Sequence, residues 1–219
     1  MRLKFLHDGI HGESSMTRRT PVARDVRRLD AADLEVIVIP HSHNDPGWKK
    51  TYMKYYQDDT RHILDLIVEK LNLYTDITFV WVESCFLNTW WTNQTMATRE
   101  KFRKLVKSGR LELVSGMWVA PDEASTHYFA LVDQLIEGHY WVKTNLGVSP
   151  QTSLNFDQFG YSASIPYLMK ASGLSNVLIK RIHRGMKQIL GENKWMTFNW
   201  RQLWDPQGKH DIFTQVHVH

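Results

Sequence analysis

His43 and Asp45 stand two residues apart in the segment His-Ser-His-Asn-Asp-Pro-Gly-Trp, residues 41–48. In a locally extended segment, residues i and i+2 project to the same side, which suits two ligands on one cation. Neutral imidazole nitrogen and anionic oxygen suit zinc, which binds such atoms at about 2.0–2.2 Å. A catalytic zinc site needs at least one further protein ligand, and Asp157 is the best candidate in the chain. These residues predict a metal-plus-carboxylate site of the kind that hydrolases use.

Each of these features also has an ordinary structural interpretation. A His-x-Asp pair is commonly part of a surface loop or a hydrogen-bonded couple, and an aspartate in the position of Asp157 is often a helix N-cap. Nine tryptophans fit a site with flat aromatic faces for sugars, but large aromatic side chains also fill cores. The functional interpretation therefore depends on whether the fold brings these residues together.

The elements that would position these residues alternate between short β-rich runs and longer helical patterns. The first run, residues 35–39, reads as a buried β-branched strand that stops at Pro40. Further strands are expected at 77–83, 111–115, 152–156, 176–181, 196–200 and 211–216. Helices are expected at 60–73, 86–107, 127–145, 163–172 and 183–190, with inward residues that include Ile63, Leu64, Ile67, Val68, Leu71, Leu131, Leu135 and Ile136. This alternation predicts an α/β fold with a mainly parallel sheet.

Polar side chains follow five of these strands, at the point where each strand ends. Because the carboxyl ends of parallel strands share one face, residues distant in sequence should converge there. No Gly-x-Gly-x-x-Gly or P-loop pattern follows the first strand, so a nucleotide-binding version of the fold has little support. The converging residues are His43 and Asp45, Glu83, Asp122 and Glu123, Asp157, and Arg181.

Composition sets the limits on partners and organisation. With 219 residues, 42% of them hydrophobic, the chain is long enough to bury a sizeable core. Residues 1–33 read as a basic N-terminal tail and 34–219 as the domain. Part of the net charge of +4 sits in that tail, and later charges are mixed in sign, so we expect no nucleic-acid partner. The single cysteine excludes an intrachain disulfide, and no apolar run is long enough to predict a transmembrane segment.

Seven segments, in order, resemble one family. Residues 41–48 look like the zinc-binding signature of the class II α-mannosidases, glycoside hydrolase family 38, and are most similar to the Golgi α-mannosidase II branch. The resemblance spans about residues 35–216 and implies the N-terminal portion of a (β/α)7-barrel-like catalytic domain, apparently truncated. The other segments are Trp-Val-Glu at 81–83, Gly-Met-Trp-Val-Ala-Pro-Asp-Glu-Ala at 116–124, Gln-Leu-Ile-Glu-Gly at 134–138, Asp-Gln-Phe-Gly at 157–160, Leu-Ile-Lys-Arg-Ile-His at 178–183 and Trp-Arg-Gln-Leu-Trp-Asp at 200–205.

The resemblance assigns roles residue by residue. His43 and Asp45 resemble two zinc ligands, and Asp157 resembles the residue that both binds zinc and attacks the anomeric carbon in a retaining mechanism. As substrate-binding residues, Trp48 resembles an aromatic wall of the sugar subsite, Phe159 a contact beside the nucleophile, and Arg181 an arginine near that carboxylate. A structural salt bridge is the alternative for Arg181. The family further implies a Zn2+ cofactor, mannose-containing N-glycan substrates and a Golgi location, lumenal or membrane-bound.

The sequence also departs from the family pattern. The nucleophile segment usually reads Asp-Pro-Phe-Gly-His-Ser, whereas residues 157–162 carry Gln158 and Tyr161 in place of proline and histidine. Losing proline removes a fixed φ and restores a backbone N–H, so the loop is expected to be less fixed. By resemblance, the fourth zinc ligand and the acid/base aspartate lie beyond residue 219. His217 and His219 are further candidate ligands, although a frayed chain end is the simpler expectation.

Three functional hypotheses follow. The first is a zinc-dependent retaining α-mannosidase, present here as a fragment with partial zinc binding and little turnover. The second is a short paralogue that binds glycans without cleaving them. The third is a structural α/β domain whose motifs are inherited but inert.

Overall fold

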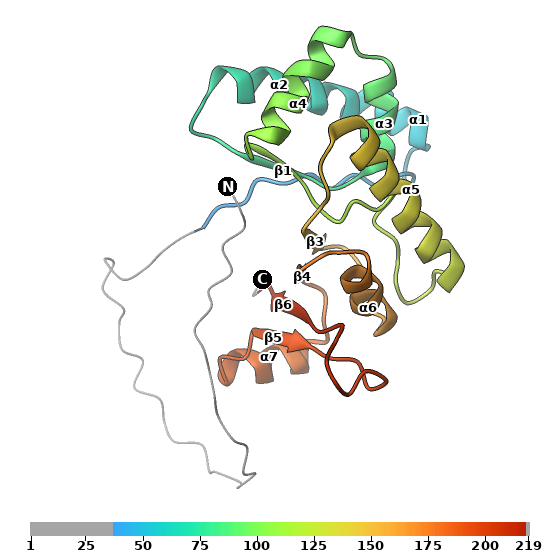
Figure 1. Cartoon of the computed structure of the whole chain (residues 1–219), viewed down its shortest axis with the longest axis vertical. Coiled ribbons are helices and arrows are strands. Elements are labelled where there is room, and N and C mark those ends of the chain that lie inside the picture. The colour runs from blue at the N-terminus through green and yellow to red at the C-terminus, as the bar shows by residue number, and fades with distance from the viewer. Residues whose placement is uncertain (1–36, 218–219) are drawn as a thin grey trace, which may run out of the picture.

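The computed structural model describes residues 37–217, so the predicted tail at 1–33 and His219 lie outside the described residues (Figure 1). Within residues 37–217, six strands form two small sheets. In the first, β1 (Phe79–Trp81) pairs in parallel with β2 (Leu111–Leu113). The second has the order β3-β4-β6-β5, from β3 (Thr152–Asn155), β4 (Asn176–Ile179), β6 (Ile212–Val216) and β5 (Thr197–Trp200). Only the β5–β6 pairing is antiparallel among the described strands, so the predicted mainly parallel α/β arrangement is confirmed, while a closed barrel is not formed by residues 37–217.

Ser115 links the two sheets. Its backbone N–H donates to the Thr152 carbonyl over 2.7 Å, and its hydroxyl accepts from the Leu154 N–H over 3.0 Å. Ser115 adopts a left-handed conformation with φ of 59°, which is uncommon for a residue other than glycine. The buried side chains of Val80, Val114 and Leu154 pack in one cluster beside this link. The strand ends of the two sheets therefore lie close enough to share a site.

The first predicted strand is not formed at residues 37–39, of which Ile37 and Val38 are exposed and Ile39 is partly buried against the cluster around Val80. Residues 37–39 form no strand, and the side chains of Ile37 and Val38 are 42% and 72% exposed. Backbone pairing with β1 begins only at Pro40, whose carbonyl accepts from the Val80 N–H over 2.9 Å. The Ser42 N–H donates back to the Val80 carbonyl, also over 2.9 Å. The prediction of a buried strand was wrong for residues 37–39 because β-branched composition indicates compatibility with a strand but does not show that a neighbour covers it.

Helices surround the sheets, with α1 to α4 gathered at the β1 end of the molecule and α6 and α7 at the β5–β6 end (Figure 1). Their bounds follow the predicted pattern with two differences. They are α1 (Tyr52–Tyr55), the π-helix η2 (Tyr56–Thr60), α2 (Arg61–Leu73), α3 (Ser84–Thr92), α4 (Met96–Lys107), α5 (Tyr128–Leu146), α6 (Ser164–Ala171) and α7 (Arg184–Glu192).

The two differences come from N-caps inside the predicted segments. The helix expected at 60–73 is preceded by a further stretch from Tyr52, because the Thr51 side chain accepts from the Lys54 N–H and caps the start. The single helical region expected at 86–107 is two helices, because Thr95 accepts from the Thr98 N–H and begins α4 anew.

Four of the tryptophans lie in the core. Trp81 and Trp90 are fully buried, and Trp91 and Trp141 are nearly so, which confirms the core interpretation for these four. The inward stripe of α2 matches its prediction at Leu64, Ile67, Val68 and Leu71, and that of α5 at Leu131 and Leu135. Ile63 and Ile136, predicted to point inward, are 38% and 63% exposed because they lie at the margin of each stripe.

Gly138 permits the close approach of α5 to the loop after β2. An added Cβ would lie 2.0 Å from the Gly116 carbonyl oxygen and 2.6 Å from the Met117 carbonyl carbon, both of them backbone atoms. We expect Gly138→Ala to destabilise the fold by about 1–3 kcal/mol, because α5 and the loop must separate. Urea unfolding monitored by circular dichroism measures this change.

The matched control is Gly191→Ala, also within a helix, where an added Cβ meets nothing within 4 Å. That substitution should stabilise α7 by about 0.5–1 kcal/mol, because alanine has the higher helix propensity. Equal effects from the two substitutions would show that helix propensity, and not the close approach, determines the outcome at Gly138.

Candidate metal and carboxylate site

The loop that bears His43 and Asp45 is held by the buried carboxylate of Glu83, which follows β1. Glu83 is 1% exposed. It accepts from the Ser42 hydroxyl and the Asn44 N–H, each over 2.8 Å, and from the Asn44 side-chain amide over 3.2 Å. Burial raises the pKa of the Glu83 carboxyl, and the hydrogen bonds from Asn44 and Ser42 oppose that rise. Ser42 and Asn44 are the neighbours of His43 in the chain, so Glu83 fixes the backbone on both sides of the His43 side chain.

The π-helix adds a second support to the same loop. Thr60, the last residue of η2, is 1% exposed, and its hydroxyl donates to the Asn44 side-chain oxygen over 3.1 Å. Single π-turns inside α-helices are frequent at functional sites. Asn44 thereby links two elements: the π-helix, through Thr60, and the end of β1, through Glu83.

The loop that bears Asp157 is held by a second buried glutamate, Glu123, which is 5% exposed. One oxygen of Glu123 accepts from the Asn155 side-chain amide over 2.7 Å, and the other accepts from the Ser162 N–H over 3.1 Å. The Tyr161 hydroxyl donates to the Asn155 carbonyl over 2.8 Å. Gln158, in the place of the family proline, is buried, and its Oε1 has no hydrogen-bond partner. The loop expected to be less fixed is therefore tied at both ends.

His43, Asp45 and Asp157 come together at the strand ends. The His43 Nε2 lies 3.5 Å from Asp45 Oδ1 and 3.4 Å from Asp157 Oδ2, and one ligand atom from each residue lies within 4.8 Å of the others. Ligands at about 2.0–2.1 Å from a tetrahedral zinc lie about 3.4 Å apart, so the two measured separations fit a shared ion. All three side chains are more than one third exposed, which leaves the group accessible to a ligand from outside.

Arg181 contacts the other oxygen of Asp157. Its Nη2 donates to Asp157 Oδ1, so one carboxylate oxygen faces the guanidinium and the other faces His43. The Arg181 guanidinium also lies 5.8 Å from the centre of the Phe159 ring. The predicted convergence of Asp157, Arg181 and the residues of the first loop is thus observed. The pairing of Arg181 with Asp157 fits a structural salt bridge as well as the predicted role of Arg181 beside the nucleophile.

The aromatic residues assigned to a sugar subsite are exposed. Trp48 is 72% exposed and lies 4.4 Å from the Lys49 ammonium, and Phe159 is 61% exposed. Flat exposed faces of this kind suit a sugar ring, but their roles as subsite walls stay predictions. His217 is half-buried, donates its N–H to the Ile179 carbonyl over 2.8 Å and stacks edge-on against Phe156, so it is not frayed.

Sequence reasoning placed Glu83 and Glu123 among the converging polar residues without giving them a role. It did not single out Thr60, Asn44 or the contacts of the Tyr161 hydroxyl. The available signal was a lone carboxylate directly after an apolar strand, as in Trp-Val-Glu at 81–83, because a carboxylate in such a place must be paired or hydrogen-bonded.

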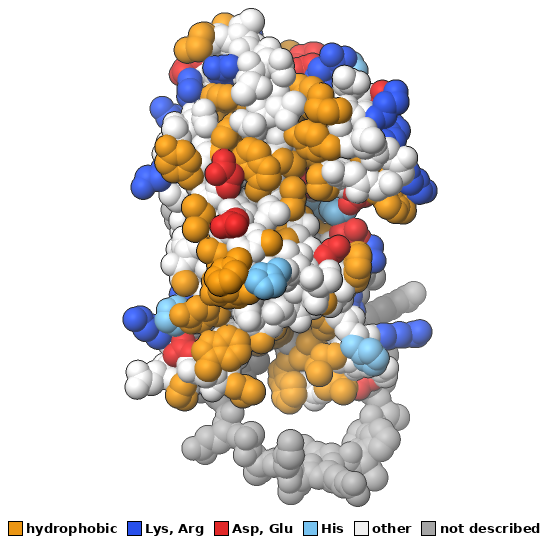
Figure 2. Space-filling view, turned by 90° about the vertical axis from the view of Figure 1, so that its right-hand side faces the viewer, with side chains coloured by type: hydrophobic (Ala, Val, Ile, Leu, Met, Phe, Trp, Pro, Cys, Tyr) orange, Lys and Arg blue, Asp and Glu red, His pale blue; other side chains and the backbone are white. Residues whose placement is uncertain are grey.

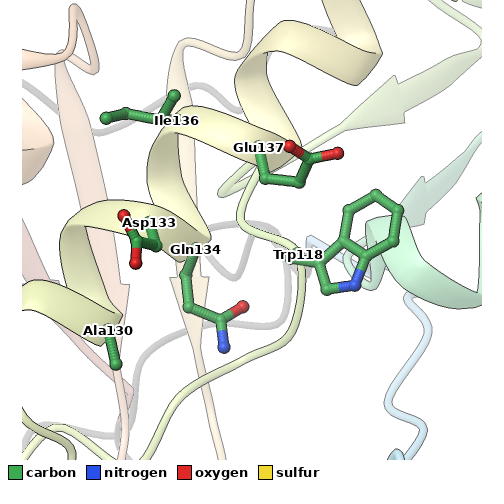
Figure 3. A pocket seen from close by; sticks show the side chains of 6 residues that line it. All are labelled: Trp118, Ala130, Asp133, Gln134, Ile136 and Glu137. Atoms are coloured by element: carbon green, nitrogen blue, oxygen red, sulfur yellow. The ribbon is translucent and has the colours of Figure 1, made fainter.

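A hollow of about 460 Å³ lies along α5, and none of the residues assigned to the site lines it (Figure 3). It is lined by Trp118, Ala130, Asp133, Gln134, Ile136 and Glu137. Figure 2 shows hydrophobic side chains spread over this side of the molecule, with acidic groups among them. Gln134 supports the neighbouring loop, since its Oε1 accepts from the Val119 N–H over 2.9 Å.

Burial raises the pKa of Glu123 to about 7, with the hydrogen bonds from Ser162 and Asn155 opposing the rise. Because the folded-state pKa lies above the unfolded value, Glu123 contributes stability that is present below about pH 4.5 and is lost as pH rises through 7. The shift corresponds to about 3 kcal/mol. We expect Glu123→Gln to lack this loss, so that wild type loses about 6–12 °C in melting temperature relative to the variant between pH 4.5 and 7.5.

Thermal unfolding of both proteins across this pH range measures the difference. The raised pKa of Glu83 and the lowered pKa of His139 also change the wild-type profile, in opposite directions, but both groups are present in both proteins and cancel. Parallel profiles for wild type and Glu123→Gln would contradict the assignment.

Comparisons with known proteins identify the family to which the chain is similar. Residues 33–219 match the family model described as the Glycosyl hydrolases family 38 N-terminal domain. The chain is 51% identical over 171 residues to the Alpha-mannosidase 2 of Spodoptera frugiperda, covering 78% of this chain and 15% of that protein. It is 44% identical over 187 residues to the Alpha-mannosidase 2 of Homo sapiens, covering 85% and 16%. The chain therefore spans about one sixth of the length of these relatives.

Solved structures show the same fold at lower identity. The crystal structure of an alpha-mannosidase from Enterococcus faecalis superposes with a TM-score of 0.65 at 17% identity, covering 82% of this chain and 20% of that one. A 4-alpha-glucanotransferase from Thermococcus litoralis gives a TM-score of 0.55 at 14% identity, covering 81% and 26%.

Proposed function

The chain belongs to glycosyl hydrolase family 38, and from that premise we propose that its site serves a zinc-dependent retaining α-mannosidase acting on mannose-containing N-glycans. The observation that supports this proposal best is the meeting of His43, Asp45 and Asp157 within ligand distance of one another. The loop that bears His43 and Asp45 is held by the buried Glu83, and the loop that bears Asp157 is held by the buried Glu123. Such support orients metal ligands and raises affinity in known sites.

In this proposal Asp157 has two tasks, as a zinc ligand and as the nucleophile. Its Oδ2 faces His43 and its Oδ1 is paired with Arg181, so each carboxylate oxygen has a different neighbour. In the proposed reaction a carboxylate oxygen of Asp157 forms a bond to the anomeric carbon as the bond to the leaving oxygen breaks, and water later cleaves the glycosyl ester. A zinc ion held by His43, Asp45 and Asp157 would supply positive charge for the sugar hydroxyls.

The remaining parts of the proposal follow the family. Departure of the leaving group needs a carboxylic acid about 5–5.5 Å from the nucleophile, and the resemblance places that aspartate and a fourth zinc ligand beyond residue 219. Trp48 and Phe159 would contact the sugar through their exposed faces. We propose residues 34–219 as the N-terminal portion of a (β/α)7 barrel, because the run of parallel pairings from the His41–Val80 bridge to β6 is linked across the two sheets by Ser115.

The proposed location is the Golgi, lumenal or membrane-bound, as the Golgi branch of the family implies. None of the helices among residues 37–217 is both long and apolar enough to cross a membrane.

An assay of the 219-residue chain on an aryl α-mannoside, with zinc added and with zinc removed by a chelator, tests the proposal. Zinc-dependent turnover with retained anomeric configuration supports a retaining α-mannosidase. Mannose binding without turnover, measured by calorimetry, would replace it with the glycan-binding alternative. Failure to bind zinc, or a zinc affinity that is unchanged in His43→Ala, would overturn the metal site itself.

A further inference from the structure

We propose that Tyr161 is a positioning residue that holds Arg181 against the carboxylate of Asp157. This inference deepens the proposed function, because it concerns the arginine that pairs with the proposed nucleophile. It does not depend on turnover or on a bound ion. The family segment usually carries a histidine at this position, where this chain carries Tyr161.

The hydroxyl of Tyr161 is fully used. It donates to the Asn155 carbonyl over 2.8 Å and accepts from the Lys180 N–H over 2.9 Å and from the Arg181 N–H over 3.2 Å. A phenolic hydroxyl has one hydrogen to donate and accepts at its oxygen, so these three contacts exhaust its capacity. The group is partly buried, and burial raises the pKa of the phenol, which keeps its proton in place for Asn155.

These contacts connect Tyr161, Arg181 and Asp157 in a closed set of interactions. Asp157 and Tyr161 belong to one loop, which follows β3, and Arg181 follows the neighbouring strand β4. Tyr161 fixes the backbone of Arg181, and the side chain of Arg181 returns to Asp157 Oδ1. The hydroxyl therefore sets the position from which the guanidinium reaches the carboxylate.

The ring of Tyr161 and its hydroxyl have separable roles. The ring packs against a buried cluster that includes Ile165 and Ile179, and this contact needs no oxygen. Removing the hydroxyl alone, in Tyr161→Phe, keeps that packing and leaves two backbone N–H groups and one carbonyl without their partner. A suitable control is Tyr167→Phe, which removes another partly buried phenol whose ring lies against Trp204 and His210.

Nuclear magnetic resonance of the metal-free, 15N-labelled chain tests the proposal through the side-chain Nε–H signal of Arg181, with Asp157→Ala defining the unpaired position. We expect Tyr161→Phe to move this signal most of the way to the Asp157→Ala position and to speed amide exchange at Arg181 by about tenfold or more. Tyr167→Phe should leave both unchanged. An Arg181 signal that keeps its wild-type position in Tyr161→Phe would overturn the proposal, even if the protein is less stable.

Zinc affinity, measured by competition with a chromophoric chelator, supplies a second test. If Tyr161 acts through Arg181, Tyr161→Phe should weaken zinc binding severalfold when it is made in the wild-type chain. The same substitution made in the Arg181→Ala variant should then have no further effect on zinc binding. A purely structural role predicts the same loss in both backgrounds, and that result would also overturn the proposal. If the chain binds no zinc, the proposed function fails, while the resonance measurement still decides the role of Tyr161.

Discussion

Asp157→Asn is expected to lower turnover of an aryl α-mannoside by about 10³-fold or more, with thermal stability nearly unchanged. The amide has the shape of the carboxylate but carries no charge, so it cannot form the glycosyl ester on which a retaining mechanism depends. It also gives Arg181 a neutral partner and offers a weaker oxygen to the ion proposed beside His43. Steady-state kinetics at saturating zinc separates the loss of the nucleophile from the loss of metal.

The matched control is Asp76→Asn, which neutralises an exposed carboxylate in the connection between α2 and β1. Its turnover should stay within about twofold of wild type, because surface substitutions away from a site have small effects. If Asp157→Asn kept more than a tenth of the wild-type rate, Asp157 would not be the nucleophile. The cluster would then be a binding site only.

Glu83→Ala is expected to weaken zinc binding by about 10–100-fold, although Glu83 is not itself a proposed ligand. Its carboxylate holds Ser42 and Asn44 on either side of His43, and a buried donor and a partly buried donor would lose their acceptor. Each buried donor left unpaired costs about 1–3 kcal/mol. We therefore also expect the melting temperature to fall by about 6 °C or more. Chelator competition and thermal unfolding measure the two effects.

Two further variants show whether these losses come from the hydrogen bonds. Glu83→Gln keeps one acceptor oxygen and should fall between wild type and Glu83→Ala. Glu69→Ala removes an exposed carboxylate on α2 and should change neither quantity measurably. If Glu83→Ala destabilised the fold without changing zinc affinity, the loop would hold its shape without the glutamate, and the support assigned to Glu83 would be wrong.

The sequence predicted most elements because their periodicity is strong and their ends are marked. The helix over 127–145 was found within one residue at each end, since Gly147 closes it in a left-handed conformation. The convergence of His43, Asp45 and Asp157 followed from their shared position after strands of a parallel sheet, strengthened by the family resemblance. Their roles, however, came from the resemblance and not from spacing.

The features that were missed depend on contacts between segments distant in sequence. Nothing in the run of β-branched residues at 35–39 shows that pairing with β1 begins only at Pro40. A π-turn has no reliable sequence signal, so Thr60 could not be placed against Asn44 in advance. The hydroxyl of Tyr161 meets Asn155 at the end of β3 and the two residues that follow β4, and the register of β4 against β3 is fixed only in the folded molecule.

The link between the two sheets at Ser115 bears on the local unfolding of the sheets. His43 and Asp45 belong to the segment paired with β1, whereas Asp157 follows β3, so the ligands come from opposite sides of that link. An ion held by all three would connect the two sheets. Local opening of one sheet would then release the ion and lose its binding free energy, which joins the two sheets into one cooperative unit. Zinc should therefore slow amide exchange in β1 and β3 together, and chelation should let the two exchange independently.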